Sequence, residues 1–267
     1  MTLEVLCPAK VNLFLAVGPL DHRGYHPIRT VFQAIDLCDV LRFRVADGED
    51  RIECDWDGLP EENTMTRTLR LVRELIPVPP LHIELEKRIP AESGLGGGSS
   101  DAGGLLRALR KIVYPAPPEE FLHDVAAAVG KDVPFFLLGG RARGEGYGER
   151  LTPLPDPQGG WYVVVRPHGV GCSTKEAYAR LDAMSYPFRE FSNELDMYND
   201  FERVAPCESL EYIETFGAYG ARGALLCGSG SAVFGLFDDE NSARMAVYRL
   251  SQDARISVWI AQPMPRF

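Results

Sequence analysis

The stretch SGLGGGSSDAGG, residues 93–104, most constrains what this chain can fold into. Six of the eleven residues from Gly94 to Gly104 are glycine. An alternating apolar pattern, typical of a strand, precedes them, and apolar residues at helical spacing follow. A flexible linker or a loop that wraps an anion would explain the glycines. Because a linker is not expected between a strand and an amphipathic helix, the flanking patterns favour the anion loop.

An anion could be held here without a basic side chain inside the loop. Glycine lets the backbone approach a ligand closely, and the first amides of the following helix have no partner within the helix. The helix dipole and the hydroxyls of Ser99 and Ser100 would add to the attraction. The absence of a lysine at the helix start excludes a Walker A loop. Ser99 stands where a Rossmann fingerprint would have its third glycine.

A second loop of glycine and serine, CGSGSAVFG, lies at residues 227–235. Alone it is a weak signal, because such loops are common in hairpin turns. Together with the first loop it predicts two backbone cradles.

Composition limits the classes of partner. The 267 residues carry a formal net charge of −10, and the isoelectric point is about 5.1. An acidic surface argues against nucleic acid or an anionic membrane as the main partner, but a local basic pocket could still bind a phosphorylated small molecule. No two of the six cysteines lie within four residues of each other, and no apolar run is long enough to span a bilayer. We therefore expect a cytoplasmic protein with reduced cysteines.

The order of expected elements indicates an α+β fold and not a regular alternation of strands and helices. Strands are expected at 3–7, 11–17, 41–45, 52–56, 81–85, 161–167 and 256–260, with two more around the loop within 224–237. Helices are expected at 62–75, 102–113, 118–129 and 241–250, with another beginning at Ser173. Residues 154–160, LPDPQGG, are the best candidate for a domain junction, although a surface turn within one domain has nearly equal weight.

Several segments resemble the motifs of the GHMP small-molecule kinases. These are PAKVNLFL near the N-terminus, GLGGGSSDA in the middle and GSGSAVFG near the C-terminus. RGYH, GKDVPFF, STKEAY and NDFE resemble, in order and spacing, the member of this family that phosphorylates a hydroxyl group of a cytidine diphosphate derivative. The resemblance implies a two-domain α+β fold. Residues 1–155 would form a domain like domain 2 of ribosomal protein S5, and 156–267 a ferredoxin-like domain, with the ligands in the cleft between them.

The resemblance also implies ATP-dependent phosphorylation of a small-molecule alcohol, with Lys10 and Asp132 as catalytic residues. Asp132 would accept the proton of the acceptor hydroxyl, and Lys10 would lie beside it and help neutralise developing charge. Without the motifs, Asp132 would be a reasonable helix N-cap and Lys10 a solvated surface residue.

The substrate would be bound by Asn12, Tyr25 and His26. Asn12 lies on the same side of an extended segment as the catalytic lysine and would hydrogen-bond the reacting end of the substrate. Tyr25 and His26 would recognise the cytosine by stacking and by hydrogen bonds to the base edge. A second aromatic ring is expected on the base, and Tyr178 and Phe188 are both candidates.

ATP would be bound by the second motif, with Mg²⁺ to offset the triphosphate charge and Ser100 as a candidate metal ligand. Asp101 would turn away from the phosphates or reach Mg²⁺ through water. The predicted ATP-binding residues are Asn63 and Lys87, near the adenine, and Pro90, Gly94, Leu95, Gly96, Gly97, Gly98, Ser99 and Ser100. The predicted residues of the third motif are Gly228, Ser229, Gly230 and Ser231.

Two other functions share part of this pattern. Another GHMP kinase, acting on homoserine, mevalonate or a sugar, would have the same glycine loop, but RGYH argues against it because those substrates carry no cytosine. A non-catalytic nucleotide-binding protein of this fold would not need Lys10 and Asp132. We expect a monomer or a weak homodimer.

Overall fold

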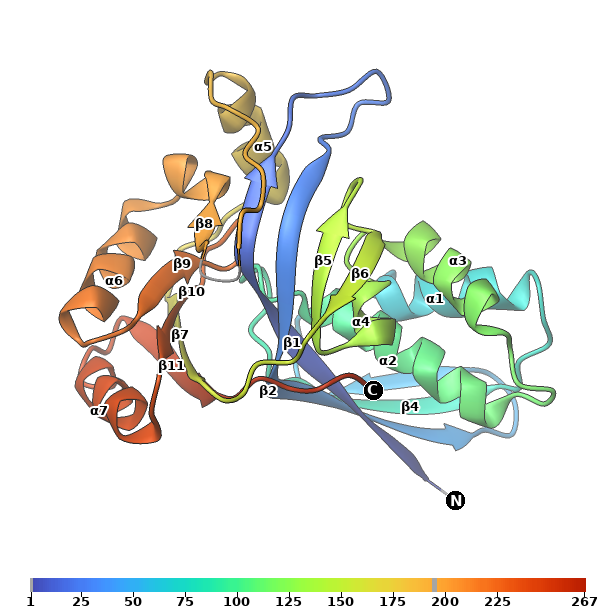
Figure 1. The fold of residues 1–267 in the computed structure, drawn as a ribbon. Coiled ribbons are helices and arrows are strands. Elements are labelled where there is room, and N and C mark those ends of the chain that lie inside the picture. Colours follow the sequence, from blue (N-terminus) through green and yellow to red (C-terminus); the bar gives the residue numbers. More distant parts are fainter. Residues whose placement is uncertain (1, 194–195) are drawn as a thin grey trace.

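Two long antiparallel strands, β1 (Leu3–Val17) and β2 (Ile28–Val45), run through the centre of the molecule (Figure 1). The structure, a computed structural model, describes residues 2–193 and 196–267. The expected break at Pro8 is wrong, because β1 is continuous from residue 3 to residue 17. Pro8 lies at a register shift between β1 and β2, where irregular pairing tolerates a residue without an N–H group.

The N-terminal unit is a seven-stranded sheet with helices packed on one face (Figure 1). Its main path is β3-β4-β2-β1-β8, and β5 pairs with β2 and β6. The further strands are β3 (Arg51–Cys54), β4 (Leu81–Glu86), β5 (Arg141–Glu145), β6 (Arg150–Leu154) and β8 (Tyr198–Asn199). The helices are α1 (Thr64–Arg73), α2 (Gly97–Ile112), α3 (Glu119–Val129) and α4 (Phe135–Leu138).

The C-terminal unit is a four-stranded antiparallel sheet in the order β11-β7-β10-β9. Its strands are β7 (Trp161–Pro167), β9 (Gly223–Leu226), β10 (Val233–Phe237) and β11 (Ile256–Ala261). Its helices are α5 (Thr174–Asp182), the short helix η1 (Asp200–Val204), α6 (Cys207–Ala218) and α7 (Glu240–Leu250). This strand order is that of a ferredoxin-like domain, so the expected fold class is confirmed. Among the described residues, no helix is both long enough and apolar enough to cross a bilayer.

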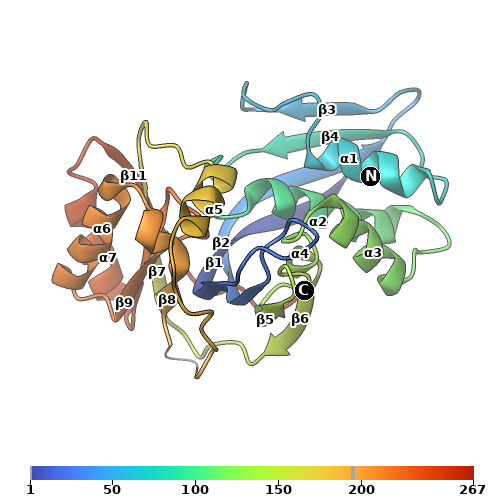
Figure 2. The same cartoon turned by 90° about the horizontal axis from the view of Figure 1, so that it is seen from above.

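The two units lie side by side with β1 and β2 between them, and they share an apolar core (Figure 2). Successive residues of β7 point to opposite faces of its sheet. Val163 and Val165 belong to the cluster that includes the residues of α6 and α7, whereas Tyr162 and Val164 belong to the cluster that contains Val11 of β1. The second sheet is therefore buried on both faces, which explains its continuous apolar strands.

A buried carboxylate also joins the units. Asp200, in the segment NDFE, is fully buried, and its carboxylate accepts a hydrogen bond from the backbone N–H of Val17 at 2.9 Å. The guanidinium of Arg203 donates to the same carboxylate at 3.1 Å, and the hydroxyl of Tyr198 donates as well. Asp200 thus fixes the end of β1 to the C-terminal half of the chain.

The chain passes between the units several times, because β8 pairs with β1 although it lies in sequence between α5 and η1 of the C-terminal unit. It first leaves the N-terminal sheet after β6, and after β11 it returns, so that the N–H of Met264 donates to the carbonyl of Ala34 at 2.8 Å. The N–H of Phe267 then donates to the carbonyl of Leu138, and the guanidinium of Arg107 lies 3.5 Å from the centre of the Phe267 ring. The predicted halves 1–155 and 156–267 are therefore joined by backbone contacts outside the predicted junction.

We expect Asp200→Ala to lower the free energy of unfolding by about 2–3 kcal/mol, because the buried N–H of Val17 loses its acceptor. The melting temperature should fall by roughly 4 °C or more. Thermal unfolding would measure this against Asp238→Ala, whose carboxylate is exposed and pairs with Arg222. Equal melting temperatures for the two variants would contradict the role of Asp200 between the units.

Candidate active site

A cavity of about 1230 Å³ lies between the glycine-rich loop, β1 and the C-terminal unit, and most of the predicted site residues line it. Those that line it are Lys10, Asn12, Tyr25, His26, Asn63, Lys87, Pro90, Gly94, Gly96, Gly97, Gly98, Ser99, Asp132, Gly228 and Ser229. Those that do not line it are Leu95, Ser100, Gly230 and Ser231.

The two glycine-rich loops contact each other. Gly94 has a φ of +79°, and a Cβ atom there would lie 1.8 Å from the carbonyl oxygen of Cys227. Gly96 is left-handed and directly precedes α2, so the first amides of the helix lie beside the cavity. The two predicted cradles are therefore neighbouring walls of one site.

The side chain of Lys10 lies where these loops meet. Its backbone N–H donates to the carbonyl of Leu95 at 2.9 Å, and its ammonium donates to the amide oxygen of Asn12 at 2.8 Å. The same ammonium lies 3.5 Å from a carboxylate oxygen of Asp132. The amide nitrogen of Asn12 donates to the hydroxyl of Thr30 at 2.8 Å. Asn12 thus orients Lys10, and its contact with the substrate stays a prediction.

Asp132 lies two residues before Pro134 at the start of α4. Its side chain makes no capping hydrogen bond to that helix, so the interpretation of Asp132 as an N-cap is not supported. The side chain is 33% exposed and faces Lys10 and the cavity. The pair combines a proton acceptor with a fixed cation.

His26 is held by groups on both ring nitrogens. Nδ1 lies 2.9 Å from the carbonyl oxygen of Gly18, and Nε2 lies 3.5 Å from the carboxylate of Asp182 in α5. The His26 ring stacks on Tyr178, also in α5, with centroids 4.7 Å apart and planes 18° apart. Helix α5 therefore provides both the partner and the stacking surface of this histidine.

The structure distinguishes the two aromatic candidates. Tyr178 lines the cavity, stacks on His26 and meets Phe201 edge to face. Phe188 does not line the cavity and lies under the guanidinium of Arg29, 3.8 Å from the ring centre. Burial raises the pKa of Tyr178, so its hydroxyl stays protonated at neutral pH.

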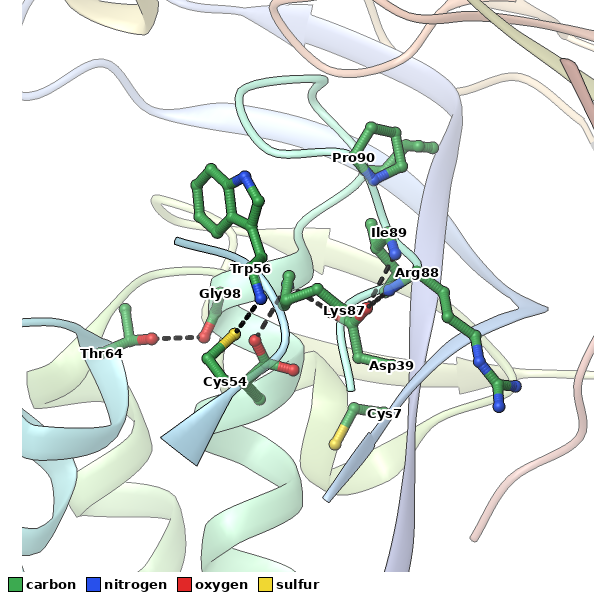
Figure 3. A network of polar contacts seen from close by, with 12 residues as sticks. Cys7, Asp39, Cys54, Trp56, Thr64, Lys87, Arg88, Ile89, Pro90 and Gly98 are labelled. Atoms are coloured by element: carbon green, nitrogen blue, oxygen red, sulfur yellow. Dashed lines mark hydrogen bonds and ion pairs between the residues drawn. The ribbon is translucent and has the colours of Figure 1, made fainter. Parts of the chain in front are cut away.

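Lys87 is the centre of a polar cluster behind the glycine-rich loop (Figure 3). Its ammonium donates to Asp39 at 2.5 Å and to Asp101 at 3.1 Å. The fully buried Asp39 also accepts the backbone N–H groups of Arg88 and Ile89, at 2.6 and 2.7 Å. Lys87 lines the cavity, but its ammonium is paired with these carboxylates. Because Lys87 precedes the loop and Asp101 follows it in α2, their contact joins the two ends of the loop.

The charges of this cluster are coupled. Burial and the neighbouring carboxylate of Asp39 raise the pKa of Asp101 to about 8. Burial lowers the pKa of Lys87, but the carboxylates of Asp101 and Asp39 outweigh it and raise the pKa above its ordinary value. Asp101 therefore releases its proton less readily than an ordinary aspartate, and it lies beside the Lys87–Asp39 ion pair.

Comparison with known proteins agrees with this geometry. Residues 63–140 match the family described as GHMP kinases N terminal domain, and residues 193–255 match GHMP kinases C terminal. A 4-diphosphocytidyl-2-C-methyl-D-erythritol kinase of Geobacter sp. (strain M21) is 37% identical, over 94% of this chain and 95% of that protein. The chain belongs to the 4-diphosphocytidyl-2-C-methyl-D-erythritol kinase family of the GHMP kinases.

Solved structures place this kinase fold in a wider group. A crystal structure of 4-(cytidine 5'-diphospho)-2C-methyl-D-erythritol kinase is similar with a TM-score of 0.77 and 34% identity, over 97% of this chain and 98% of that chain. The homoserine kinase from Cytophaga hutchinsonii has a TM-score of 0.71, over 99% of this chain and 95% of that chain. At 19% identity, the second similarity shows the fold alone.

The kinase cavity also contains aromatic residues that the motifs did not identify. Tyr147, in the segment GEGYGE, packs against Tyr25 with ring centres 5.3 Å apart and donates its hydroxyl to Asp21 at 2.6 Å. Trp56, which follows β3, lines the cavity as well, as does Asn63. Tyr147 lies in the segment that continues GKDVPFF, residues 130–149, which resembles the kinase motifs as a whole, whereas Trp56 belongs to no motif and is placed in the site by the fold.

Oxygen donors for a divalent cation are few but suitable. Ser99, Asp101 and Asp132 line the cavity, whereas the hydroxyl of Ser100 is buried and has no hydrogen-bond partner among the described residues. Mg²⁺ often takes only one or two protein ligands and completes its shell with phosphate oxygens and water. The residues present fit such an ion when a triphosphate is bound, and Ser100 as a direct ligand stays a prediction.

We expect Asp101→Asn to change the dependence of stability on pH. Between the ordinary aspartate pKa of 3.8 and about 8, folded wild type holds a proton that the unfolded chain releases. The stabilisation that this proton supplies is therefore lost as the pH rises towards 8, and asparagine does not titrate. The melting temperature of the variant relative to wild type should rise by roughly 2 °C or more between pH 5 and pH 9.

Differential scanning fluorimetry across this pH range would measure the change, with the exposed Asp238→Asn as the matched control. Parallel curves for wild type and Asp101→Asn would contradict a proton held on Asp101.

Proposed function

We propose that this protein transfers the γ-phosphoryl group of ATP to the 2-hydroxyl of 4-diphosphocytidyl-2-C-methyl-D-erythritol, a step of the non-mevalonate route to isoprenoid precursors. The Lys10–Asp132 pair carries this proposal, because its 3.5 Å contact lies between the glycine-rich loop and the His26–Tyr178 stack. A phosphate donor and a cytidine-containing acceptor would meet at this pair.

The chemistry requires positioning and charge stabilisation more than a strong base. Asp132 accepts the proton of the acceptor hydroxyl, and in a loose transition state this proton leaves late. Lys10 faces the same point and offsets charge on the transferred group. The hydrogen bonds from Lys10 to Asn12 and from Asn12 to Thr30 fix the direction of the ammonium.

ATP lies along the glycine-rich loop, with its phosphates at the start of α2. The adenine lies in the part of the cavity lined by Trp56 and Asn63. The side chain of Asn63 caps α1 by accepting two backbone N–H groups, so it also shapes this wall. Ser99 and Asp132, which line the cavity, and the buried hydroxyl of Ser100 are the oxygen donors that would hold Mg²⁺, which would offset the charge of the triphosphate.

The cytosine lies in the aromatic part of the cavity formed by Tyr25, His26 and Tyr178. Tyr25 is 54% exposed at the rim, where it can close over a base that rests against α5. Homoserine, mevalonate and sugars carry no cytosine to stack on these rings. We also propose a cytoplasmic monomer or weak homodimer, and the acidic net charge argues against a nucleic-acid or anionic-membrane partner.

Turnover with different acceptors tests this function. With ATP and Mg²⁺, the cytidyl substrate should give a kcat/KM at least about 100-fold above that of homoserine, mevalonate or galactose, because only it fills the aromatic part of the cavity. A coupled assay of ADP release would measure the four rates. Faster phosphorylation of any of the other three alcohols would overturn the assignment.

We expect Asp132→Ala to reduce kcat by at least about 100-fold, because the hydroxyl proton loses its acceptor. The affinity for ATP should stay nearly unchanged. A loss of turnover without a loss of ATP binding would distinguish a kinase from a protein that only binds nucleotides. Calorimetry and steady-state kinetics would measure both quantities, with Asp124→Ala on the exposed face of α3 as control. Wild-type activity in Asp132→Ala would remove the proposed role.

A further inference from the structure

The cavity is lined by more cations than the proposed mechanism uses. Among the described residues, five lysine and arginine side chains line it: Lys10, Lys87, Lys131, Arg166 and Lys175. Lys10 and Lys87 are engaged by carboxylates, and Lys131 lies 5.6 Å from the ring centre of a tyrosine. In the part of the chain that the structure describes, the side chains of Arg166 and Lys175 form no hydrogen bond or ion pair, and Nε of Arg166 is buried.

Arg166 faces the cavity because of the alternation of β7. It lies on the same face as Tyr162 and Val164, which pack towards β1, and it follows Val165, which pairs with Val233 of β10. Just before Val233, the N–H of Ala232 donates to the carbonyl of Ser93 at the start of the glycine-rich loop. Arg166 therefore lies on the C-terminal unit beside the point where the loops of the two units meet.

Lys175 lies in the first turn of α5, which is fixed to the second loop. The hydroxyl of Thr174 lies 2.9 Å from that of Ser229, and the thiol of Cys172 donates to the carbonyl of Ser229 at 2.8 Å. Glu92 is the carboxylate that lines the entrance of the glycine-rich loop, and it forms no ion pair with Arg166 or Lys175. These two cations remain without a counter-charge at one wall of the site.

We propose that Arg166 and Lys175 form a polyphosphate-binding site on the C-terminal wall of the cavity, opposite the amides of the glycine-rich loop. The proposal rests on the proposed function, which brings a triphosphate and a diphosphate into this cavity. A guanidinium with a buried, unpaired Nε is unfavourable until an anion accepts its hydrogen bonds, and a phosphate matches its fork geometry. The ligand comes from one of two sources, the phosphates of ATP or the diphosphate of the cytidyl substrate.

Nucleotide affinities with and without phosphates test the site. In Arg166→Met and Lys175→Met, the affinity for CDP, for ADP or for both should fall by about 10-fold, the loss expected for one charge-assisted hydrogen bond. The affinities for cytidine and adenosine should change by less than about 2-fold, because nucleosides carry no phosphate. A loss confined to CDP assigns the site to the substrate diphosphate, and a loss confined to ADP assigns it to ATP.

The matched control is Arg180→Met, also in α5, which is exposed and does not line the cavity. CDP and ADP affinities equal to those of this control would overturn the proposal. A parallel loss of nucleoside affinity would overturn it as well, because that result indicates a distorted site. If Arg166→Met does not fold, Lys175→Met and the charge-preserving Arg166→Lys decide the question.

Wild-type turnover separates this proposal from the proposed function. If wild type binds CDP and ADP through both cations but phosphorylates no cytidyl substrate, the function fails and the site stands. If wild type phosphorylates the substrate and both variants bind nucleotides like the control, only the site fails.

Discussion

The contact between Gly94 and Cys227 is the constraint on which the rest of the site depends. A Cβ atom at residue 94 would lie 1.8 Å from the carbonyl oxygen of Cys227, so only glycine allows the two loops to meet. Lys10 fills the corner that they form, and Asn199 supports the second loop by donating to the carbonyls that flank Cys227. Close backbone packing, and not a long basic side chain, therefore sets the distance between the two loops.

The described cations around the cavity fall into two groups, one paired with carboxylates and one unpaired. Behind the glycine-rich loop, Lys87 is surrounded by carboxylates, and this arrangement stiffens the loop without presenting a free cation to the ligand. On the C-terminal wall, the side chains of Arg166 and Lys175 have no such partners among the described residues. An overall net charge of −10 therefore hides a local region suited to anions. Under the proposed function, this separation would let an acidic protein accommodate two highly charged nucleotides.

Local sequence predicted much of the fold and of the site, because strand alternation, helical spacing and glycine motifs act over a few residues. Interactions between distant residues could not be predicted in this way. Asp39 lies 48 residues from Lys87 and belongs to no motif, so the engagement of Lys87 was missed. Helix α6 was not among the expected helices, because a serine, Ser209, occupies one of its buried positions and weakens the apolar pattern. Strand β1 was expected to break at Pro8, but a register shift accommodates the proline.

The return of the chain after β11 affects how the cleft can move. The backbone crosses between the units at residues 154–160 and again beyond Ala261, where it is hydrogen-bonded to the strand and helix segments of the first unit. Strand β8 also pairs with β1 in the first unit, and these crossings, with a shared apolar core, leave no single hinge about which the halves could swing. This packing favours small shear displacements between packed layers over a hinge-like opening of the cleft.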